Sequence, residues 1–490
     1  MREIYDFNRE GRIYEMSKEN DKIVVLYKKF TNNMLENVNY ERYLVIKTDL
    51  ESEHINQWIP IHFKVDEERK SGPFDLYVYN AVKLKAKGES RIIISYSKEK
   101  EKALSRANLE VSDINKMKIS SINTDDEKKV AYNCALRSVD DLYVDINSNQ
   151  GFYAGLPWFF QIWTRDEAIS LKSVIMQGKF DIAKNIFLKR IKYVDNGRVP
   201  NRFPFSMLGT ADGTGWIFRR VLDYFLELEK RKNPLEQYIG RRDIEFIRTQ
   251  LKKSIDYHIK NYTTSYLIHN NADETWMDTS HKNDTREGYR IEIQALWLSM
   301  LRLMNKLDLI LERKEQFSNL EDETKEFVRK EFFDGTILKD GKDDPTVRPN
   351  IFLAYYLYSD ILTNKEWETV FDNSIPKLWL PWGGFTTIDK TSALYCPDYT
   401  GEDNRSYHRG DSWFFVNNIA AISMFSLNKD KYKEYIEKIV NASTKDILYN
   451  GVIGRPSEVS SASSQKAQGC GFQLWSAATY AEMMMVMFGN

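Results

Sequence analysis

The sequence predicts a small antiparallel β-sandwich followed by a larger, mainly α-helical domain, and three observations lead to this fold class. Residues 1–120 contain short runs in which apolar and polar residues alternate. The remaining residues place apolar side chains three and four positions apart. A chain of 490 residues that is 42% hydrophobic is also long enough for more than one domain. We therefore expect the β domain at residues 1–120, a linker to about residue 129, and the helical domain at residues 130–490.

Five segments of the first part have the pattern of β-strands. Their apolar and polar residues alternate, and charged or Gly/Pro-containing turns separate them. These segments are residues 22–30, 43–50, 58–65, 74–87 and 91–98. The polar stretch from about Ser105 to Lys129 is the predicted linker.

Five later segments have the pattern of helices. They are residues 166–191, 215–232, 292–310, 412–427 and 473–488. Several of them are apolar on more than one face, which is expected of helices that pack between other helices.

Composition excludes several classes of partner. The 70 Lys and Arg residues nearly balance the 71 Asp and Glu residues, so no basic field attracts nucleic acid or an anionic membrane. Cys134, Cys396 and Cys470 fit neither a disulfide framework nor a zinc site, and we interpret them as reduced thiols. The charged N-terminal residues and the lack of a run of eighteen apolar residues indicate neither secretion nor membrane insertion. We therefore expect a cytoplasmic protein that binds neither nucleic acid nor membrane.

Clusters of aromatic, glycine and acidic residues precede most of the predicted helices. Examples are "GLPWFFQIWTRDEA", "NNADETWMDTS" and "YHRGDSW". If the helices alternate in direction, such loops gather at one end of the domain and form a funnel lined with tryptophan and carboxylates. Aromatic rings stack on the apolar faces of sugars, and carboxylates bind sugar hydroxyls. A tryptophan alone is equally typical of a core, but its repeated coupling to an acid favours a carbohydrate site.

A set of short motifs resembles one enzyme family. In chain order they are "WTRDEA", "VPNRF", "ADGTGW", "ADETWMD", "YRIEIQALW", "VRPN", "YHRGDSW" and "CGFQLWSAA". Their order is similar to that in the amylo-α-1,6-glucosidase domain of glycogen debranching enzymes, a clan related to the glucoamylases. The resemblance spans roughly Tyr153 to the C-terminus. It implies an (α/α)6 barrel preceded by a β-rich domain, and inverting hydrolysis of an α-glucosidic bond in an α-glucan or oligosaccharide, without metal or organic cofactor.

Inverting hydrolysis needs a general acid and a general base about 6.5–9.5 Å apart. The resemblance points to Asp278 in "ADETWMD" as the acid, and the adjacent Trp276 would desolvate it and raise its pKa. Asp273 and Glu274 remain the competing candidates, although Asp273 could instead cap the following turn.

For the base, the resemblance implies a glutamate in a Pro-Glu pair shortly before the last helix. The matching residue is Glu458, the only carboxylate between Gly451 and Trp475. The chain departs from the family pattern because Ser457 separates Pro456 from Glu458. A surface glutamate in a serine-rich loop is the alternative interpretation, and Asp411 is then the next candidate.

The resemblance also implies a substrate-binding shell. Arg165 and Asp166 resemble the pair that grips the terminal glucose in glucoamylase-like sites, although Asp166 could also cap a helix. The other expected contacts are Trp163, Asp212, Trp216, Trp276, Arg290, Glu292, Gln294, His408 and Trp413. Glu292 and Gln294 do not share a helical face, so at least one of them is expected to serve the scaffold. Without paired histidine spacing, His408 is better interpreted as a hydrogen-bonding wall than as a metal ligand.

The most specific expectation is hydrolysis of α-1,6-linked glucose at glycogen branch stubs. A glucanotransferase does not fit into residues 1–120, so a separate protein would have to trim the branch first. A glucoamylase or trehalase specificity is the main alternative. A glycoside phosphorylase would need an anion site near the base, and a non-catalytic glucan-binding protein would lack one of the two carboxylates.

Overall fold

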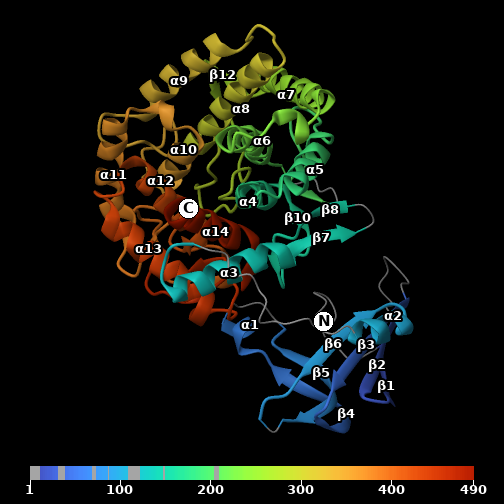
Figure 1. Cartoon of the computed structure of the whole chain (residues 1–490). Helices are drawn as coiled ribbons and strands as arrows, with labels where there is room; N and C mark the ends of the chain where they lie inside the picture. Colours follow the sequence, from blue (N-terminus) through green and yellow to red (C-terminus); the bar gives the residue numbers. More distant parts are fainter. Residues whose placement is uncertain are drawn as a thin grey trace. The chain divides into compact units, whose positions relative to one another are not determined.

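The computed structural model of the chain describes residues 11–30, 39–68, 73–86, 88–108, 122–146, 149–203 and 209–489. The chain divides into two compact units, Met1–Lys118 and Ile119–Asn490, which are described separately below (Figure 1). The stretch expected to be a linker is helical at both of its described ends, because α2 ends at Ala107 and α3 begins at Asp126. Residues 109–121 lie outside the described residues. The Asp125 carboxylate accepts a hydrogen bond from the Lys128 backbone N–H and so caps α3.

Unit 1 contains six described strands and two short helices. They are β1 (Arg12–Glu19), β2 (Lys22–Phe30), β3 (Asn39–Thr48), β4 (Glu51–His62), α1 (Lys64–Glu68), β5 (Asp75–Lys85), β6 (Ile92–Ser97) and α2 (Lys100–Ala107). The order β1-β2-β3-β6 forms a four-stranded antiparallel sheet, and β4 pairs with β5. The strand expected at residues 58–65 ends earlier, at His62, because the chain turns into α1.

Both faces of the four-stranded sheet are covered, since successive side chains of a strand point to opposite faces. On one face, Val24 and Val45 pack against Ala103 and Ala107 of α2. On the other face, Ile23, Val25 and Ile46 form a second apolar cluster. Val82 and Leu84 of β5 pack against this cluster. The prediction of an antiparallel β region before the helices is confirmed.

Unit 2 is mainly helical, as predicted. Its helices are α3 (Asp126–Leu142), α4 (Thr164–Met176), α5 (Phe180–Ile191), α6 (Gly213–Lys230), α7 (Arg241–Asn261), α8 (Ile291–Ile310), α9 (Ser318–Phe332), α10 (Asn350–Leu357), α11 (Asn364–Leu378), α12 (Phe414–Asn428), α13 (Lys433–Lys445) and α14 (Leu474–Phe488). A π-helical turn at Asp446–Asn450 follows α13. The helix expected at residues 166–191 is two helices, because Gly178 adopts a φ of +77° between α4 and α5.

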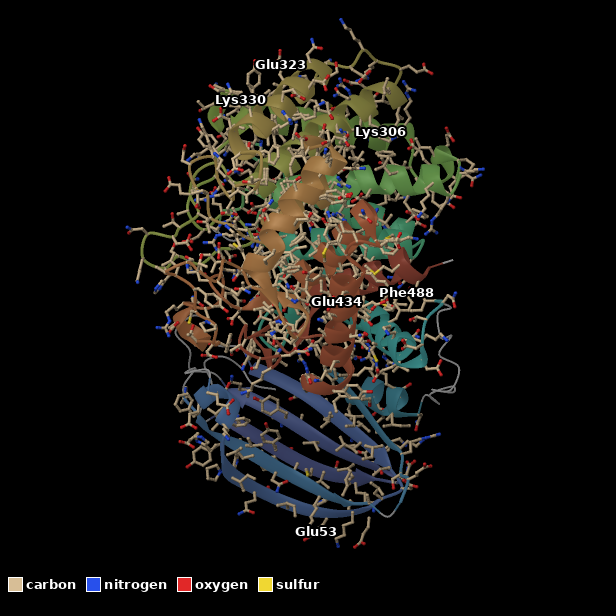
Figure 2. The ribbon with its side chains drawn as sticks, turned by 90° about the vertical axis from the view of Figure 1, so that its left-hand side faces the viewer. Glu53, Lys306, Glu323, Lys330, Glu434 and Phe488 are labelled. Carbon is tan, nitrogen blue, oxygen red and sulfur yellow. The ribbon has the colours of Figure 1, made fainter. Side chains whose placement is uncertain are left out.

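Six helices form a closed ring inside unit 2. Helices α4, α6, α8, α10, α12 and α14 each contact the next one, and α14 contacts α4 (Figure 1). The other helices pack outside them; for example, α5 contacts α4 and α6, and α9 contacts α8. The inner helices are more deeply buried than the outer ones. The inner helix α8 is buried along most of its length, whereas α9 buries Thr324, Val328 and Phe332 and exposes Glu323 and Lys330 to solvent (Figure 2).

Very short strands lie in the loops that lead into the inner helices. They are β7 (Tyr143–Ile146), β8 (Asn149–Phe152), β9 (Gly155–Leu156), β10 (Ile162–Trp163), β11 (Arg202–Phe203), β12 (Thr263–Thr264), β13 (Leu267–Ile268), β14 (Trp379–Leu380), β15 (Gly384–Phe385), β16 (Ser412–Trp413), β17 (Val459–Ser460), β18 (Ala467–Gln468) and β19 (Phe472–Gln473). Strands β10, β16 and β19 directly precede α4, α12 and α14. Strand β10 pairs with β11, β16 with β17, and β19 with β9, so neighbouring loops are held together. In the described parts of the chain, no helix is both long and apolar enough to span a membrane.

Candidate active site

A cavity of about 160 Å³ lies where the loops before α4, α12 and α14 meet. Its walls are formed by Phe159, Trp163, Arg165, Asp166, Trp276, Asp278, Tyr407, Trp413, Glu458, Gln473 and Trp475. Seven of these residues are among those that the sequence singled out. A shallower groove of about 440 Å³ lies beside α9, and no predicted site residue lines it.

The Asp278 carboxyl group faces this cavity beside an arginine. Its Oδ2 accepts a hydrogen bond from Arg165 Nη1 at 3.0 Å, and its side chain keeps 34% exposure, compared with 2% for Arg165. Burial raises the pKa of Asp278 above its ordinary value, and Arg165 opposes that rise. Arg165 is shared, because its Nε pairs with Asp212 Oδ2 at 2.6 Å. Asp278 therefore combines a raised pKa with a side chain that a ligand in the cavity can reach.

The Glu458 carboxylate faces the same cavity and is 3% exposed. Its Oε1 accepts a hydrogen bond from the Tyr407 hydroxyl at 2.5 Å, and its Oε2 accepts one from the Cys470 backbone N–H at 2.7 Å. Burial and the neighbouring Glu458 raise the pKa of Tyr407 well above its usual range, so the phenol remains a donor. Both carboxylate oxygens are thus fixed as acceptors.

Gly469 lies against this carboxylate. Its φ is +66°, and a Cβ at this position would lie 2.4 Å from Glu458 Oε2. Glycine is therefore required here both for the backbone conformation and for the space that Glu458 occupies.

Asp166 is a third carboxyl group at the cavity. Burial, with a smaller contribution from the neighbouring Glu458 and Asp278, raises its pKa to about 8 although Arg165 opposes the rise. Gln473 Nε2 donates a hydrogen bond to Asp166 Oδ1 at 3.2 Å. Although Asp166 lies in the first turn of α4, the residue at the N-cap position is Trp163. The side chain of Asp166 is thus directed to the cavity rather than to capping.

Aromatic rings supply most of the remaining wall. The Trp413 ring lies 4.7 Å from the Tyr407 ring and 5.5 Å from the rings of Trp276 and Trp475, measured between centroids. Among the described residues, three buried donors of cavity-lining side chains have no hydrogen-bond partner: Arg165 Nη2, Trp163 Nε1 and Trp475 Nε1. Buried donors are normally paired, so these groups suit a ligand that carries acceptor oxygens.

Three further predicted residues do not line the cavity. Asp212 pairs with Arg165, as described above. Trp216 is buried on α6, with the Arg220 guanidinium 5.2 Å from its ring. His408 stacks on Trp413 at 5.2 Å, and its Nδ1 lies 2.7 Å from the Thr279 hydroxyl oxygen. Asp212 and His408 thus contact residues of the wall, whereas Trp216 packs within the helical core.

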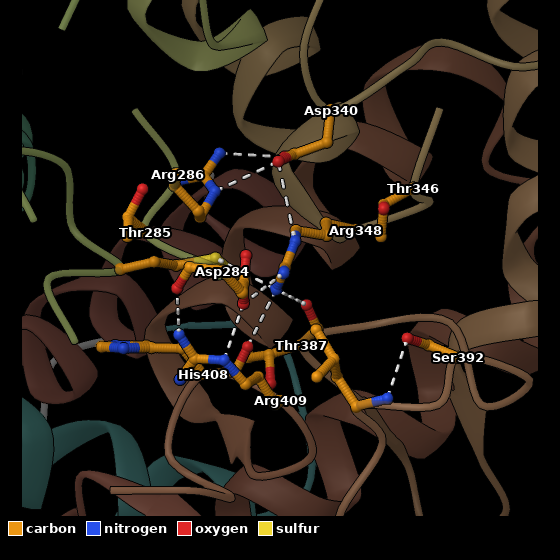
Figure 3. Close-up of polar contacts among 12 residues, drawn as sticks. Asp284, Thr285, Arg286, Asp340, Thr346, Arg348, Thr387, Ser392, His408 and Arg409 are labelled. Carbon is orange, nitrogen blue, oxygen red and sulfur yellow. Dashed lines mark hydrogen bonds and ion pairs between the residues drawn. The ribbon is translucent and has the colours of Figure 1, made fainter. Parts of the chain in front are cut away.

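Arg290, Glu292 and Gln294 do not reach the cavity. Glu292 accepts two hydrogen bonds from Arg286, at 2.8 and 3.1 Å, and Arg286 also pairs with Asp340 (Figure 3). Arg290 pairs with Asp344 at 2.6 Å and with Asp340 at 3.3 Å.

Gln294 has a separate structural role. Its side-chain oxygen accepts from the Ile268 N–H at 2.9 Å, and its amide donates to the Ile268 carbonyl at 2.8 Å. The side chains of Arg290, Glu292 and Gln294 thus bond to other protein groups, and none of the three lines the cavity.

The competing acids occupy other surroundings. Asp273 is exposed and accepts hydrogen bonds from the Ser280 hydroxyl, and Glu274 pairs with Arg198 at 2.9 Å. Asp411 is buried and accepts from the Ser406 hydroxyl, and burial raises its pKa to about 8. None of the three lines the cavity.

Four cavity residues were not predicted: Phe159, Tyr407, Gln473 and Trp475. Each lies within a quoted motif, since Phe159 belongs to "GLPWFFQIWTRDEA", Tyr407 to "YHRGDSW", and the other two to "CGFQLWSAA". The motifs therefore included all four of these cavity residues. Within the described ranges, no group of three or more His, Cys, Asp or Glu side chains is arranged to hold a metal ion.

The arrangement is suited to proton transfer on a neutral, polyhydroxylated ligand. Asp278 and Glu458 face one aromatic cavity in different surroundings, and beside them are the donors that have no partner among the described residues. Environments that differ in this way are typical of acid and base pairs.

Comparison with known proteins agrees with this chemistry. Residues 78–482 match the model of a family described as amylo-alpha-1,6-glucosidase. The match begins within β5, earlier than the resemblance in the motifs. No curated protein sequence matches the chain.

Solved structures share the fold at low sequence identity. A GH63 mannosylglycerate hydrolase from Thermus thermophilus, in complex with Tris, is 12% identical with a TM-score of 0.55; the alignment covers 72% of this chain and 99% of that one. An uncharacterized conserved protein from Thermus thermophilus gives the same values. A wild-type glycosidase is 11% identical with a TM-score of 0.53, and the alignment covers 74% of this chain and 98% of that one.

Proposed function

The chain belongs to the amylo-alpha-1,6-glucosidase family, and from this premise we propose that it releases glucose by inverting hydrolysis of α-1,6 bonds at glycogen branch stubs. Its class of reaction, glycoside hydrolysis, follows from the family. The observation that carries the proposal is the placement of Asp278 and Glu458 on one small aromatic cavity. A non-catalytic glucan-binding protein would have no need for both.

In the proposed mechanism, Asp278 donates its proton to the glycosidic oxygen as the bond from the anomeric carbon to that oxygen breaks. Glu458 accepts a proton from the water that attacks the opposite face of the sugar. The products are β-glucose and a glucan with a free hydroxyl, and proton exchange with solvent restores both carboxyl groups. Tyr407 and the Cys470 N–H hold Glu458 for this step, because each donates to one of its oxygens.

Arg165 and Asp166 are proposed to bind the sugar that is released. Arg165 Nη2 is buried without a partner among the described residues, and the raised pKa of Asp166, about 8, supports a protonated carboxyl that can donate to a sugar oxygen. Apolar contact to the faces of the sugar ring would come from Trp163, Trp276, Trp413 and Trp475. The cavity volume of about 160 Å³ is below the ~300–1,000 Å³ typical of ligand pockets, which favours removal of one terminal sugar at a time.

We further propose that the closed ring of six helices and its outer helices form an (α/α)6 barrel, and that the sheets of unit 1 form a β-sandwich. The ring contacts and the two covered faces of the four-stranded sheet support this. Residues 130–490 would then be the catalytic domain, preceded by a β domain at residues 1–120.

The cellular setting is also a proposal. Among the described residues, Cys134, Cys396 and Cys470 form no disulfide, which favours a reducing compartment such as the cytoplasm. A separate glucanotransferase would first have to shorten each branch to a single glucose.

Substrate specificity is tested by incubating the purified protein with isomaltose-type, maltose-type, trehalose and branched limit-dextrin substrates. We expect glucose release from the α-1,6-linked substrates and from limit dextrin. Preference for maltose-type substrates or trehalose would instead assign a glucoamylase or trehalase activity. Dependence of turnover on phosphate would assign a phosphorylase.

The stereochemical course is followed by NMR. Because water attacks directly, β-glucose should be the first anomer to appear from an α-linked substrate. Early α-glucose would mean a covalent intermediate and would refute the inverting mechanism.

A further inference from the structure

The segment that follows Asp278 is held by buried charges rather than by regular secondary structure. Residues 279–290 precede α8 without belonging to a helix or a named strand. Within this segment, Asp284 is only 11% exposed, and its Oδ2 pairs with two arginines, Arg348 at 2.9 Å and Arg409 at 2.6 Å (Figure 3). An ion pair this well buried has few alternative arrangements.

One guanidinium holds this segment at two positions, its first residue and Asp284. Arg409 Nη2 donates to the Thr279 carbonyl at 2.5 Å and to the Asp284 carbonyl at 2.7 Å. Thr279 is the residue directly after Asp278. The position of the Asp278 backbone is therefore fixed by a residue from the loop before α12, although Arg409 does not line the cavity.

A second contact acts on the same residue. The Thr279 hydroxyl oxygen lies 2.7 Å from His408 Nδ1. Burial, together with Arg409 and Arg348, holds the pKa of His408 well below its ordinary value, so the ring is neutral and needs no counter-charge. The backbone carbonyl of His408 accepts a hydrogen bond from Arg348 at 2.9 Å. The loop before α12 thus grips Thr279 through both its backbone and its side chain.

The same loop reaches the other carboxylate. Tyr407 donates to Glu458, while His408 and Arg409 hold Thr279. Three consecutive residues therefore connect the general base with the residue next to the general acid. A displacement of this loop would change the separation of the two carboxyl groups.

We infer that Arg409 is the positioning residue of the general acid: it fixes Thr279 and Asp284 so that the Asp278 carboxyl stands over the glycosidic oxygen. This inference rests on the proposed function, since it takes Asp278 as the acid. Arg409 touches neither water nor sugar in this scheme. It acts on the protonation of the leaving group and not on the attack of water.

A comparison of leaving groups separates this role from a general effect on folding. An α-1,6-linked glucoside needs a proton on its departing oxygen, whereas fluoride departs from α-glucosyl fluoride without one. Misplacing a catalytic group by about 1 Å costs on the order of 100-fold. Arg409→Lys should therefore lower kcat on the α-1,6-linked glucoside by about 100-fold, but on α-glucosyl fluoride by no more than about fivefold, with KM nearly unchanged.

Two other variants are compared with Arg409→Lys on the same two substrates. Tyr407→Phe removes a donor to the base, so both substrates should lose rate by the same factor. Thr279→Val removes only the hydroxyl that faces His408, and it should give the leaving-group dependence of Arg409→Lys at a smaller size. It also serves as the test if Arg409→Lys does not fold.

The matched control is Arg248→Lys. Arg248 forms a buried pair with Asp308 at 2.5 Å between α7 and α8, away from the cavity, so it reports the effect of disturbing a buried arginine alone. Its rates on both substrates should stay within about twofold of the wild type.

An equal loss on both substrates in Arg409→Lys and Thr279→Val, or no loss on either, would overturn the positioning role of Arg409 and leave the proposed function intact. Failure of the wild-type protein to hydrolyse either substrate would overturn the proposed function, and the inference with it.

Discussion

A single methyl group at Gly469 should displace Glu458, the proposed general base. A Cβ there would lie 2.4 Å from Glu458 Oε2, whereas ordinary contacts begin near 3.4 Å, so one of the two atoms has to move by about 1 Å. The backbone of Gly469 cannot easily yield, because the next residue, Cys470, donates its N–H to the same oxygen at 2.7 Å. The carboxylate of Glu458 is then displaced and loses that hydrogen bond.

The expected magnitude follows from this displacement. A shift of about 1 Å in a catalytic group costs on the order of 100-fold in rate. Gly469→Ala should therefore lower kcat on an α-1,6-linked glucoside by about 100-fold. The left-handed backbone, with φ at +66°, should also cost about 1 kcal/mol of unfolding free energy.

The assay pairs steady-state kinetics with urea unfolding, and Gly454→Ala is the matched control. Gly454 has a similar φ of +80°, but the nearest atom to its Cβ would be Cys134 Sγ at an ordinary 3.6 Å. This control should lose a similar amount of stability and keep its activity. Equal rate loss in the two variants, or a Gly469→Ala variant that keeps more than about a third of the wild-type rate, would refute the reasoning.

Three further predictions address the acid, the base and a buried carboxyl group. Asp278→Asn should stay folded and bind sugar but lose about 100- to 10,000-fold in turnover, and a residual activity above about a tenth would move the assignment to another acid. Glu458→Ala should be nearly inactive on glucan, whereas azide should restore turnover of an activated glucosyl donor; full activity without azide would exclude Glu458 as the base. Burial raises the pKa of Asp446 to about 7, above the usual ~3.9, so the native chain keeps a proton that the unfolded chain releases in this interval. The free energy of unfolding should therefore fall as pH rises from about 4 to about 7, and Asp446→Asn should make the urea-derived slope shallower; an unchanged slope would contradict the raised pKa.

Local patterns predicted the helical core well. The helices at residues 215–232 and 292–310 carry apolar residues on several faces, and both became members of the inner ring, as α6 and α8. Helices such as α7 and α9 were not predicted. Their apolar residues form a narrow stripe at helical spacing among many charges, as in the buried Ile244, Ile247 and Leu251 of α7, so the sequence did carry a helical signal there.

The predicted site residues lie in two different kinds of surroundings. Asp278 and Glu458 lie 180 positions apart in the sequence, yet family motifs indicated both, and they line one cavity. Arg290 and Glu292 were indicated by the same motifs, but they pair with Asp344 and Arg286 in a buried ion network. A buried charge suits either role, and only its three-dimensional partners decide between a ligand and an ion pair.

The closure of the helical ring also sets an order of events during synthesis. Strand β9 at Gly155–Leu156 pairs with β19 at Phe472–Gln473, and Gln473 donates to Asp166, 307 positions earlier. A nascent chain that has left the ribosome as far as α12 can contain five of the six inner helices, but it has neither Trp475 nor Gln473 in its cavity wall. The wall of the cavity, the proposed active site, is therefore complete only once α14 has been made. An interrupted translation product exposes an open ring edge of apolar side chains that favours aggregation.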